Sequence, residues 1–129
     1  MLIRLSSHGG CIAELESYVK DLFSNHKLNP ELYPNILISL TEAVNNAIKH
    51  GNRYDRSKMV SVRALRKSGY LKCLISDEGK GFDYDNLPDP TAPENVEKIG
   101  GRGVFLMTQL SDRVEFRNNG STVELVFDL

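Results

Sequence analysis

The stretch TEAVNNAIKHGN, residues 41–52, decides the fold, because it ends a helix and carries polar side chains at helical spacing. Residues four apart are neighbours on a helix surface, so Glu42, Asn46 and His50 form one stripe away from the apolar side. Asparagine is a mediocre helix former, because its side chain competes with the backbone for hydrogen bonds. The stripe is therefore either a solvated helix face, with His50 complementing the helix dipole, or part of a nucleotide site.

The nucleotide interpretation gives each polar group a chemical role. Mg²⁺ prefers oxygen ligands and keeps several waters, so the side-chain carbonyl of Asn46 together with phosphate oxygens suffices to hold it. Glu42, one turn earlier, is placed to orient or deprotonate a nucleophile as a general base. This interpretation requires that the chain also holds a place for phosphates and one for a nucleobase.

The elements around this helix predict an α+β fold. Helices come first: one over residues 12–23, and then the helix of the stripe, which starts near Pro30 and stops at Gly51. The opening LIRL alternates like a strand, MVSVRAL and LKCLIS flank a KSG turn, and RVEFRNNGSTVELVFDL predicts a hairpin around Asn119-Gly120. The sheet is therefore expected to be mainly antiparallel.

Length and composition indicate a single globular domain over residues 1–129. The formal net charge of −1 argues against a general nucleic-acid-binding surface. No apolar run approaches the ~20 residues that span a bilayer, and the opening MLIRLSSHGG lacks a signal-peptide core. Cys11 and Cys73 have no CxxC partner, and the histidines show no zinc spacing. We therefore expect a cytoplasmic protein with reduced thiols and neither a membrane nor a nucleic-acid partner.

DEGKGFD, residues 77–83, directly follows the strand LKCLIS. Gly79 and Gly81 permit close approach to a flat ligand, and Asp77 is placed at the strand end to accept a hydrogen bond from an exocyclic amine. An ordinary surface turn is the alternative, because Asp and Gly are common turn residues.

IGGRGVFLM, residues 99–107, places Gly100, Gly101 and Gly103 at the start of a helix, where backbone N–H groups attract phosphate. Arg102 adds a charge that reaches a phosphate oxygen, and a flexible hinge is the alternative. Neither glycine element is a P-loop, because no GxxxxGK[ST] spacing occurs, and Leu106 stands where a dinucleotide fingerprint needs its third glycine.

The order ExxxNxxxHG, DxGxG, a proline-bearing stretch and GGxG resembles the GHKL ATPase superfamily over residues 30–129. The helix LTEAVNNAIKHGN and the ending GGRGVFLMTQLSDRVEF look like the anti-sigma-factor serine kinases of bacteria. The resemblance implies a Bergerat-type ATP-binding fold, a two-layer sandwich with helices on one face of a mixed, mainly antiparallel sheet. It also implies an ATP lid at residues 84–99.

On the helix of the stripe, the resemblance implies that Glu42 is the catalytic carboxylate and that Asn46 is the magnesium ligand. Asn45 and His50 are then expected to lie close to the phosphates. ATP and Mg²⁺ are the implied cofactors.

On the glycine elements, the resemblance implies that Asp77 reads the adenine amine, while Gly79 and Gly81 shape the adenine pocket. The residues expected to close over the phosphates are Gly100, Gly101, Arg102 and Gly103. Some anti-sigma kinases carry an arginine just before the lid glycines, whereas here Lys98 and Ile99 precede Gly100. Arg102 is therefore the expected catalytic cation, with Lys98 as the alternative.

By this resemblance the chain is expected to be an anti-sigma regulatory factor that phosphorylates an anti-anti-sigma (STAS-type) protein on serine or threonine and binds a sigma factor. One alternative is a nucleotide-dependent interaction module with little catalysis. Another is a detached histidine-kinase catalytic domain, although the first predicted helix holds no phosphoacceptor histidine. A chance coincidence of three motifs is the fourth. Dimerisation is common in the resembling family, so a homodimer is also an expected form.

Overall fold

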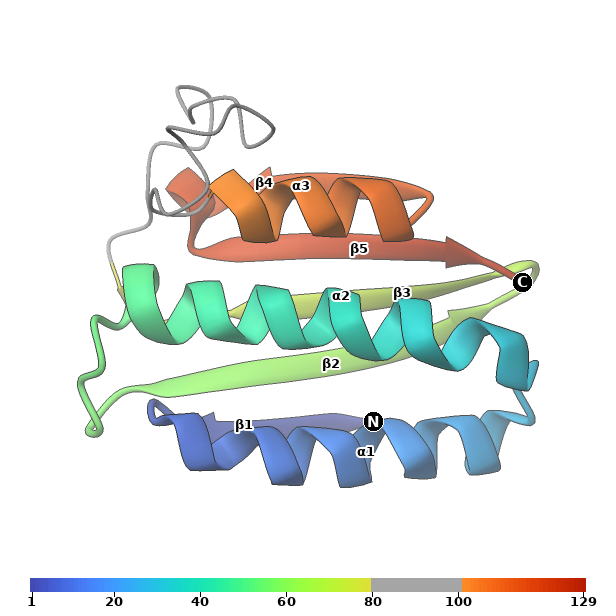
Figure 1. The fold of residues 1–129 in the computed structure, drawn as a ribbon, viewed down its shortest axis with the longest axis horizontal. Coiled ribbons are helices and arrows are strands. Elements are labelled where there is room, and N and C mark those ends of the chain that lie inside the picture. Colours follow the sequence, from blue (N-terminus) through green and yellow to red (C-terminus); the bar gives the residue numbers. More distant parts are fainter. Residues whose placement is uncertain (80–100) are drawn as a thin grey trace.

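The computed structural model describes residues 1–79 and 101–129, with backbone alone at 101, 102 and 119. Its described elements form two layers, and Figure 1 shows all three α-helices on one face of a single sheet. These helices are α1 (Ile12–His26), α2 (Tyr33–Asn46) and α3 (Gly101–Leu110). The predicted α+β class with a helix layer on one sheet face is confirmed. No described helix is both long and apolar enough to cross a membrane.

The sheet has five strands in the order β1-β2-β3-β5-β4. All four neighbouring pairs are antiparallel, so the described strands contain none of the parallel pairing expected of a mixed sheet. The strand bounds are β1 (Leu2–Ser6), β2 (Met59–Lys67), β3 (Tyr70–Ser76), β4 (Arg113–Arg117) and β5 (Thr122–Asp128). Both predicted hairpins are confirmed, and their turns use Gly69 and Gly120 at φ +84° and +89°.

The core lies between the two layers, because alternate side chains of each strand point toward the helices. In β2 the buried positions are Val60, Val62 and Ala64, and in β3 they are Leu71, Cys73 and Ile75. The helix α2 buries the apolar side that the sequence predicts, including Ile36, Leu40 and Val44. Met107 of α3 is fully buried, which anchors that helix to the core.

The helix of the polar stripe differs from the prediction in its first and last turns. It opens with a short 3₁₀ turn, η2 (Pro30–Leu32), where the Asn29 side chain accepts a hydrogen bond from the Glu31 N–H at 3.0 Å. It ends as a π-helical turn, η3 (Ala47–Gly51), in which the Asn52 N–H donates to the Ala47 carbonyl at 2.7 Å. Such wide turns are rare and concentrate at functional sites.

Both cysteines are free and buried. Burial raises the pKa of Cys73 to about 12, and burial followed by the Glu14 charge raises the pKa of Cys11. Neither thiol is therefore a reactive nucleophile near neutral pH.

Candidate functional site

Three segments that lie far apart in the sequence meet at one end of the molecule. Figure 1 shows the C-terminal end of α2, the end of β3 and the N-terminal end of α3 on the same side. The end of α2 carries the polar stripe. The end of β3 leads into the DEG turn (Asp77, Glu78 and Gly79), and the start of α3 contains Gly101 and Gly103 of the second glycine-rich stretch.

The first turn of α3 packs directly against the polar stripe. A Cβ added to Gly103 would lie 3.0 Å from Asn46 Nδ2, 3.1 Å from Asn46 Oδ1 and 3.2 Å from Glu42 Oε2. Real Cβ atoms seldom come this close to a neighbour, so glycine lets the helix backbone reach the two side chains. A helix N-terminus, a carboxamide and a carboxylate thus converge at one place, which is a suitable arrangement for an anion and a cation together.

Beside the first turn of α3, the side-chain amide nitrogen of Asn46 has no hydrogen-bond partner among the described residues. This atom, Nδ2, is buried. Leaving such a donor without a partner costs about 1–3 kcal/mol, so the amide is suited to a ligand that accepts from it. The Asn46 carboxamide and the helix start together fit a phosphate group with its cation.

Asn45 and His50 are the other two residues expected close to the phosphates. Asn45 is exposed to solvent. The wide η3 turn carries His50 onto a neighbouring cavity of about 390 Å³, which Asn46 does not line. Burial, followed by the Lys49 charge, lowers the pKa of His50, which favours the neutral imidazole.

Asp77 is held by close backbone packing at the end of β3. A Cβ on Gly51 would overlap the Asp77 carboxylate, and a Cβ on Gly79 would overlap the carbonyl oxygen of Gly51. The Gly79 N–H donates to Asp77 Oδ1 at 2.8 Å, and the Asp77 N–H donates to the Ser121 carbonyl at 2.9 Å. The glycines thus fix the position of the carboxylate.

The ionisation of Asp77 reflects this packing. Burial raises the pKa of its carboxyl, while the Gly79 N–H and the Lys58 charge act in the opposite direction. A half-buried carboxylate in such surroundings gains by accepting a hydrogen bond from a ligand donor.

A narrow cavity of about 10 Å³ joins Asn46 to Asp77. Its apolar walls come from α2, β3, α3 and β5, and include Met107 and Val123. This volume is far below the roughly 300–1,000 Å³ of a typical ligand pocket.

Asn52 is a structural residue of the site to which the sequence pattern gives no role. It is 1% exposed, and its Nδ2 donates to Ser7 Oγ at 2.8 Å and to the Met59 carbonyl at 3.1 Å. Its Oδ1 accepts from the Glu78 N–H at 2.8 Å. Asn52 therefore ties the end of α2 to β2 and to the Asp77 turn, and its position directly after His50-Gly51 is the one signal in the sequence.

Replacing Asn52 with alanine is expected to lower the free energy of unfolding by about 1–3 kcal/mol, because buried partners lose their hydrogen bonds. Urea unfolding of the nucleotide-free chain measures this change. Asn35→Ala, at an exposed position of α2, is the matched control and should stay within about 0.5 kcal/mol. Equal stability of the two variants would contradict the structural role of Asn52.

Several predicted site residues lie outside the described residues. These are Gly81, Lys98, Gly100 and the expected lid at 84–99. The backbone of Gly101 and Arg102 opens α3, while the Arg102 side chain is not described. Within residues 1–79 and 101–129, no group of three or more His, Cys, Asp or Glu side chains is placed to hold a metal ion.

Comparisons with known proteins agree with this geometry. The family model described as histidine kinase-like ATPase domain matches residues 9–127. The serine-protein kinase RsbW of Bacillus subtilis (strain 168) is 33% identical over 95 residues, which cover 68% of this chain and 59% of that protein. The proteins of the same name from Oceanobacillus iheyensis and Staphylococcus epidermidis are 29% and 31% identical, over 68% and 69% of this chain and 60% and 61% of theirs. The aligned part thus spans about three fifths of the length of these curated relatives.

Proposed function

The chain belongs to the histidine kinase-like ATPase domain family, and from this membership we propose that it is an ATP-dependent protein serine/threonine kinase. Its substrate in this proposal is an anti-anti-sigma protein of the STAS type, and the chain itself is an anti-sigma factor of the cytoplasm that also binds a sigma factor. The printed name of the relatives, serine-protein kinase, supports the choice of reaction.

The observation that carries this proposal is the contact of Gly103 with Asn46 and Glu42. Phosphoryl transfer needs phosphates held beside a group that orients the attacking hydroxyl. The start of α3 offers backbone N–H groups for the phosphates, and Glu42 lies within a few ångströms of them. The two requirements are thus met at one point.

In this proposal each of four site residues has a separate role in phosphoryl transfer. Glu42 orients the serine hydroxyl and accepts its proton, and Asn46 Nδ2 donates to a phosphate oxygen. Asp77 accepts a hydrogen bond from the adenine amine, which aligns the nucleotide between α2 and the sheet. Arg102 stabilises the charge that develops on the transferred group.

Asn46 Oδ1 is the proposed protein ligand of Mg²⁺. Asn46 Oδ1 lies beside the first turn of α3, at 3.1 Å from a Cβ added to Gly103, and fits this role, because Mg²⁺ takes few protein ligands and keeps waters and substrate phosphates around it. When bound, Mg²⁺ neutralises negative charge on the phosphates.

Incubation of the purified chain with labelled ATP and a purified anti-anti-sigma protein of the source organism tests the proposal. Label on a serine or threonine of the partner, located by phosphosite mapping, is the expected result. The presence of Lys98 and Ile99 before Gly100 favours one alternative, a nucleotide-dependent interaction module. ATP-dependent binding of the partner without phosphotransfer would replace the kinase with that module.

Replacing Asn46 with alanine is expected to remove most of the gain in ATP affinity that Mg²⁺ provides. The loss of a contact to a charged group of about 1.5–3 kcal/mol corresponds to roughly 10–100-fold in Kd. Calorimetric titration with ATP, with and without Mg²⁺, measures the change. Asn35→Ala should bind like the unmodified chain, whereas an unchanged Mg²⁺ effect in Asn46→Ala would assign the metal to another residue.

A further inference from the structure

The face of the sheet opposite the helices is not covered by any element that the structure describes (Figure 1). Side chains that point to this open face alternate with the buried core positions along each strand. Strand register places them in rows across the sheet: Arg63 lies opposite Leu2 and Leu74, and Lys72 lies opposite Leu65 and Val126. Cations and apolar side chains therefore alternate along these two rows of the open face.

The open face carries more positive charge than the rest of the chain. The whole sequence has 16 Lys and Arg against 17 Asp and Glu. The open face has twice as many cations as carboxylates. The cations are Arg4, Arg63, Lys67, Lys72, Arg113 and Arg117, and the carboxylates are Glu115, Glu124 and Asp128. The open face thus has an excess of positive charge, although the whole chain is nearly neutral.

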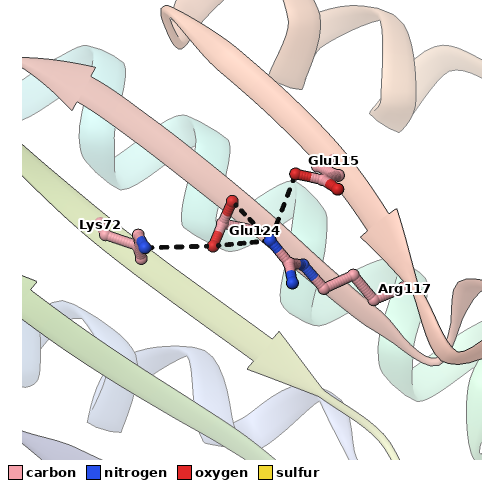
Figure 2. Close-up of polar contacts among 4 residues, drawn as sticks. All are labelled: Lys72, Glu115, Arg117 and Glu124. Carbon is pink, nitrogen blue, oxygen red and sulfur yellow. Dashed lines mark hydrogen bonds and ion pairs between the residues drawn. The ribbon is translucent and has the colours of Figure 1, made fainter.

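Two of the three carboxylates are already neutralised by cations of the same face, as Figure 2 shows. Lys72 Nζ lies 3.5 Å from Glu124 Oε1, and Arg117 lies 3.3 Å from both Glu115 and Glu124. The other cations of the face, Arg4, Arg63, Lys67 and Arg113, form no ion pair with any described residue. Their charge is available to a partner.

The face is also hollowed beside these cations. A depression of about 630 Å³ is lined by Tyr70, Lys72, Arg113 and Val126, among others. Val126 is 2% exposed, although it lies on the open face and outside the core cluster. Its neighbours thus shield an apolar floor, and Arg and aromatic side chains around such a floor are typical of protein–protein interfaces.

We propose that the open face of the sheet is a docking surface for a protein that presents carboxylates interspersed with apolar side chains. Such a partner places its carboxylates against Arg63 and Arg113 and its apolar groups against the part-exposed Leu65 and Leu74. A nucleic acid fits less well, because apolar side chains such as Leu2, Leu65 and Leu74 lie between the cations and offer nothing to a phosphate backbone. A second copy in two-fold register fits less well too, because it brings many of the same cations together.

This surface is separate from the proposed catalytic site. Glu42 and Asn46 belong to the helix layer, on the other side of the sheet (Figure 1). A protein docked on the open face leaves the proposed nucleotide site on the helix side accessible to a substrate protein. The chain can therefore hold one protein partner while it acts on another.

A fluorescent peptide of alternating glutamate and leucine, titrated with the purified full chain, tests the docking surface. Binding is expected to weaken with salt, and amide NMR signals of Arg63, Leu74 and Val126 should shift. In the double variant Arg63→Glu, Arg113→Glu we expect about tenfold weaker binding, because two complementary charges become repulsive. Lys20→Glu, an exposed charge reversal on α1, is the matched control and should change nothing.

Three results would overturn the proposal. These are equal peptide binding by the double variant, tighter binding of duplex DNA than of the peptide, and a chain dimer that the double variant abolishes. NMR mapping on the unmodified chain keeps the test valid even if the variant folds poorly. ATP titration of the same samples separates the two proposals, because loss of ATP binding would refute the kinase and leave the docking surface untouched.

Discussion

Replacing Glu42 with glutamine is expected to slow phosphoryl transfer to the partner by about 10²–10⁴-fold, the usual contribution of a general base. Glutamine keeps the size of the side chain and its contact with Gly103, but it cannot accept the proton of the attacking hydroxyl. Because Asn46 and the start of α3 are unchanged, ATP affinity should stay close to that of the unmodified chain. Single-turnover transfer from labelled ATP measures the rate.

Glu16→Gln, at an exposed position of α1, is the control for the charge change. It should transfer phosphate at the unmodified rate. Transfer by Glu42→Gln at the same speed as the control would remove Glu42 from the catalytic role and leave positioning and charge stabilisation as the source of catalysis.

Replacing Gly79 with alanine is expected to abolish measurable ATP binding. The new methyl group would overlap the Gly51 carbonyl oxygen, which is backbone and cannot rotate away. The DEG turn must then separate from the end of α2, and Asp77 loses its position beside Gly51. Overpacking of this kind also costs about 1–3 kcal/mol of stability.

Calorimetric titration with ATP and a thermal melt measure the two effects of Gly79→Ala. Gly9→Ala is the matched control, because a Cβ on Gly9 meets no atom within 4 Å. The control should bind and melt like the unmodified chain. Unchanged ATP affinity in Gly79→Ala would show that the approach of the two backbones is not needed for the nucleotide.

Local patterns in the sequence predict most of the fold. Alternation in MVSVRAL and LKCLIS gives β2 and β3, and Asn119-Gly120 marks the turn between β4 and β5. The spacing of Ile36, Leu40 and Val44 gives the buried side of α2. These signals are readable because side chains two, three or four positions apart share a face of one element.

The π-helical turn at Ala47–Gly51 is a feature that local pattern did not predict. Ideal helical spacing joins His50 to Glu42 and Asn46, whereas the wide turn places it on another cavity. The turn is stabilised from outside the helix, through Asn52 and its bonds to Ser7, Met59 and Glu78. A sequence pattern that covers only a few helical turns cannot reveal hydrogen-bond partners this distant in sequence.

By itself the sequence determined the elements, the apolar side of α2 and the chemical types at the site, since these follow from spacing along one segment. Only the tertiary structure decided which of these groups meet. Gly103 reaches Asn46, Gly79 reaches Gly51, and cations of four strands share one face. These contacts depend on helix packing and strand register, which arise when distant segments bury their apolar surfaces together.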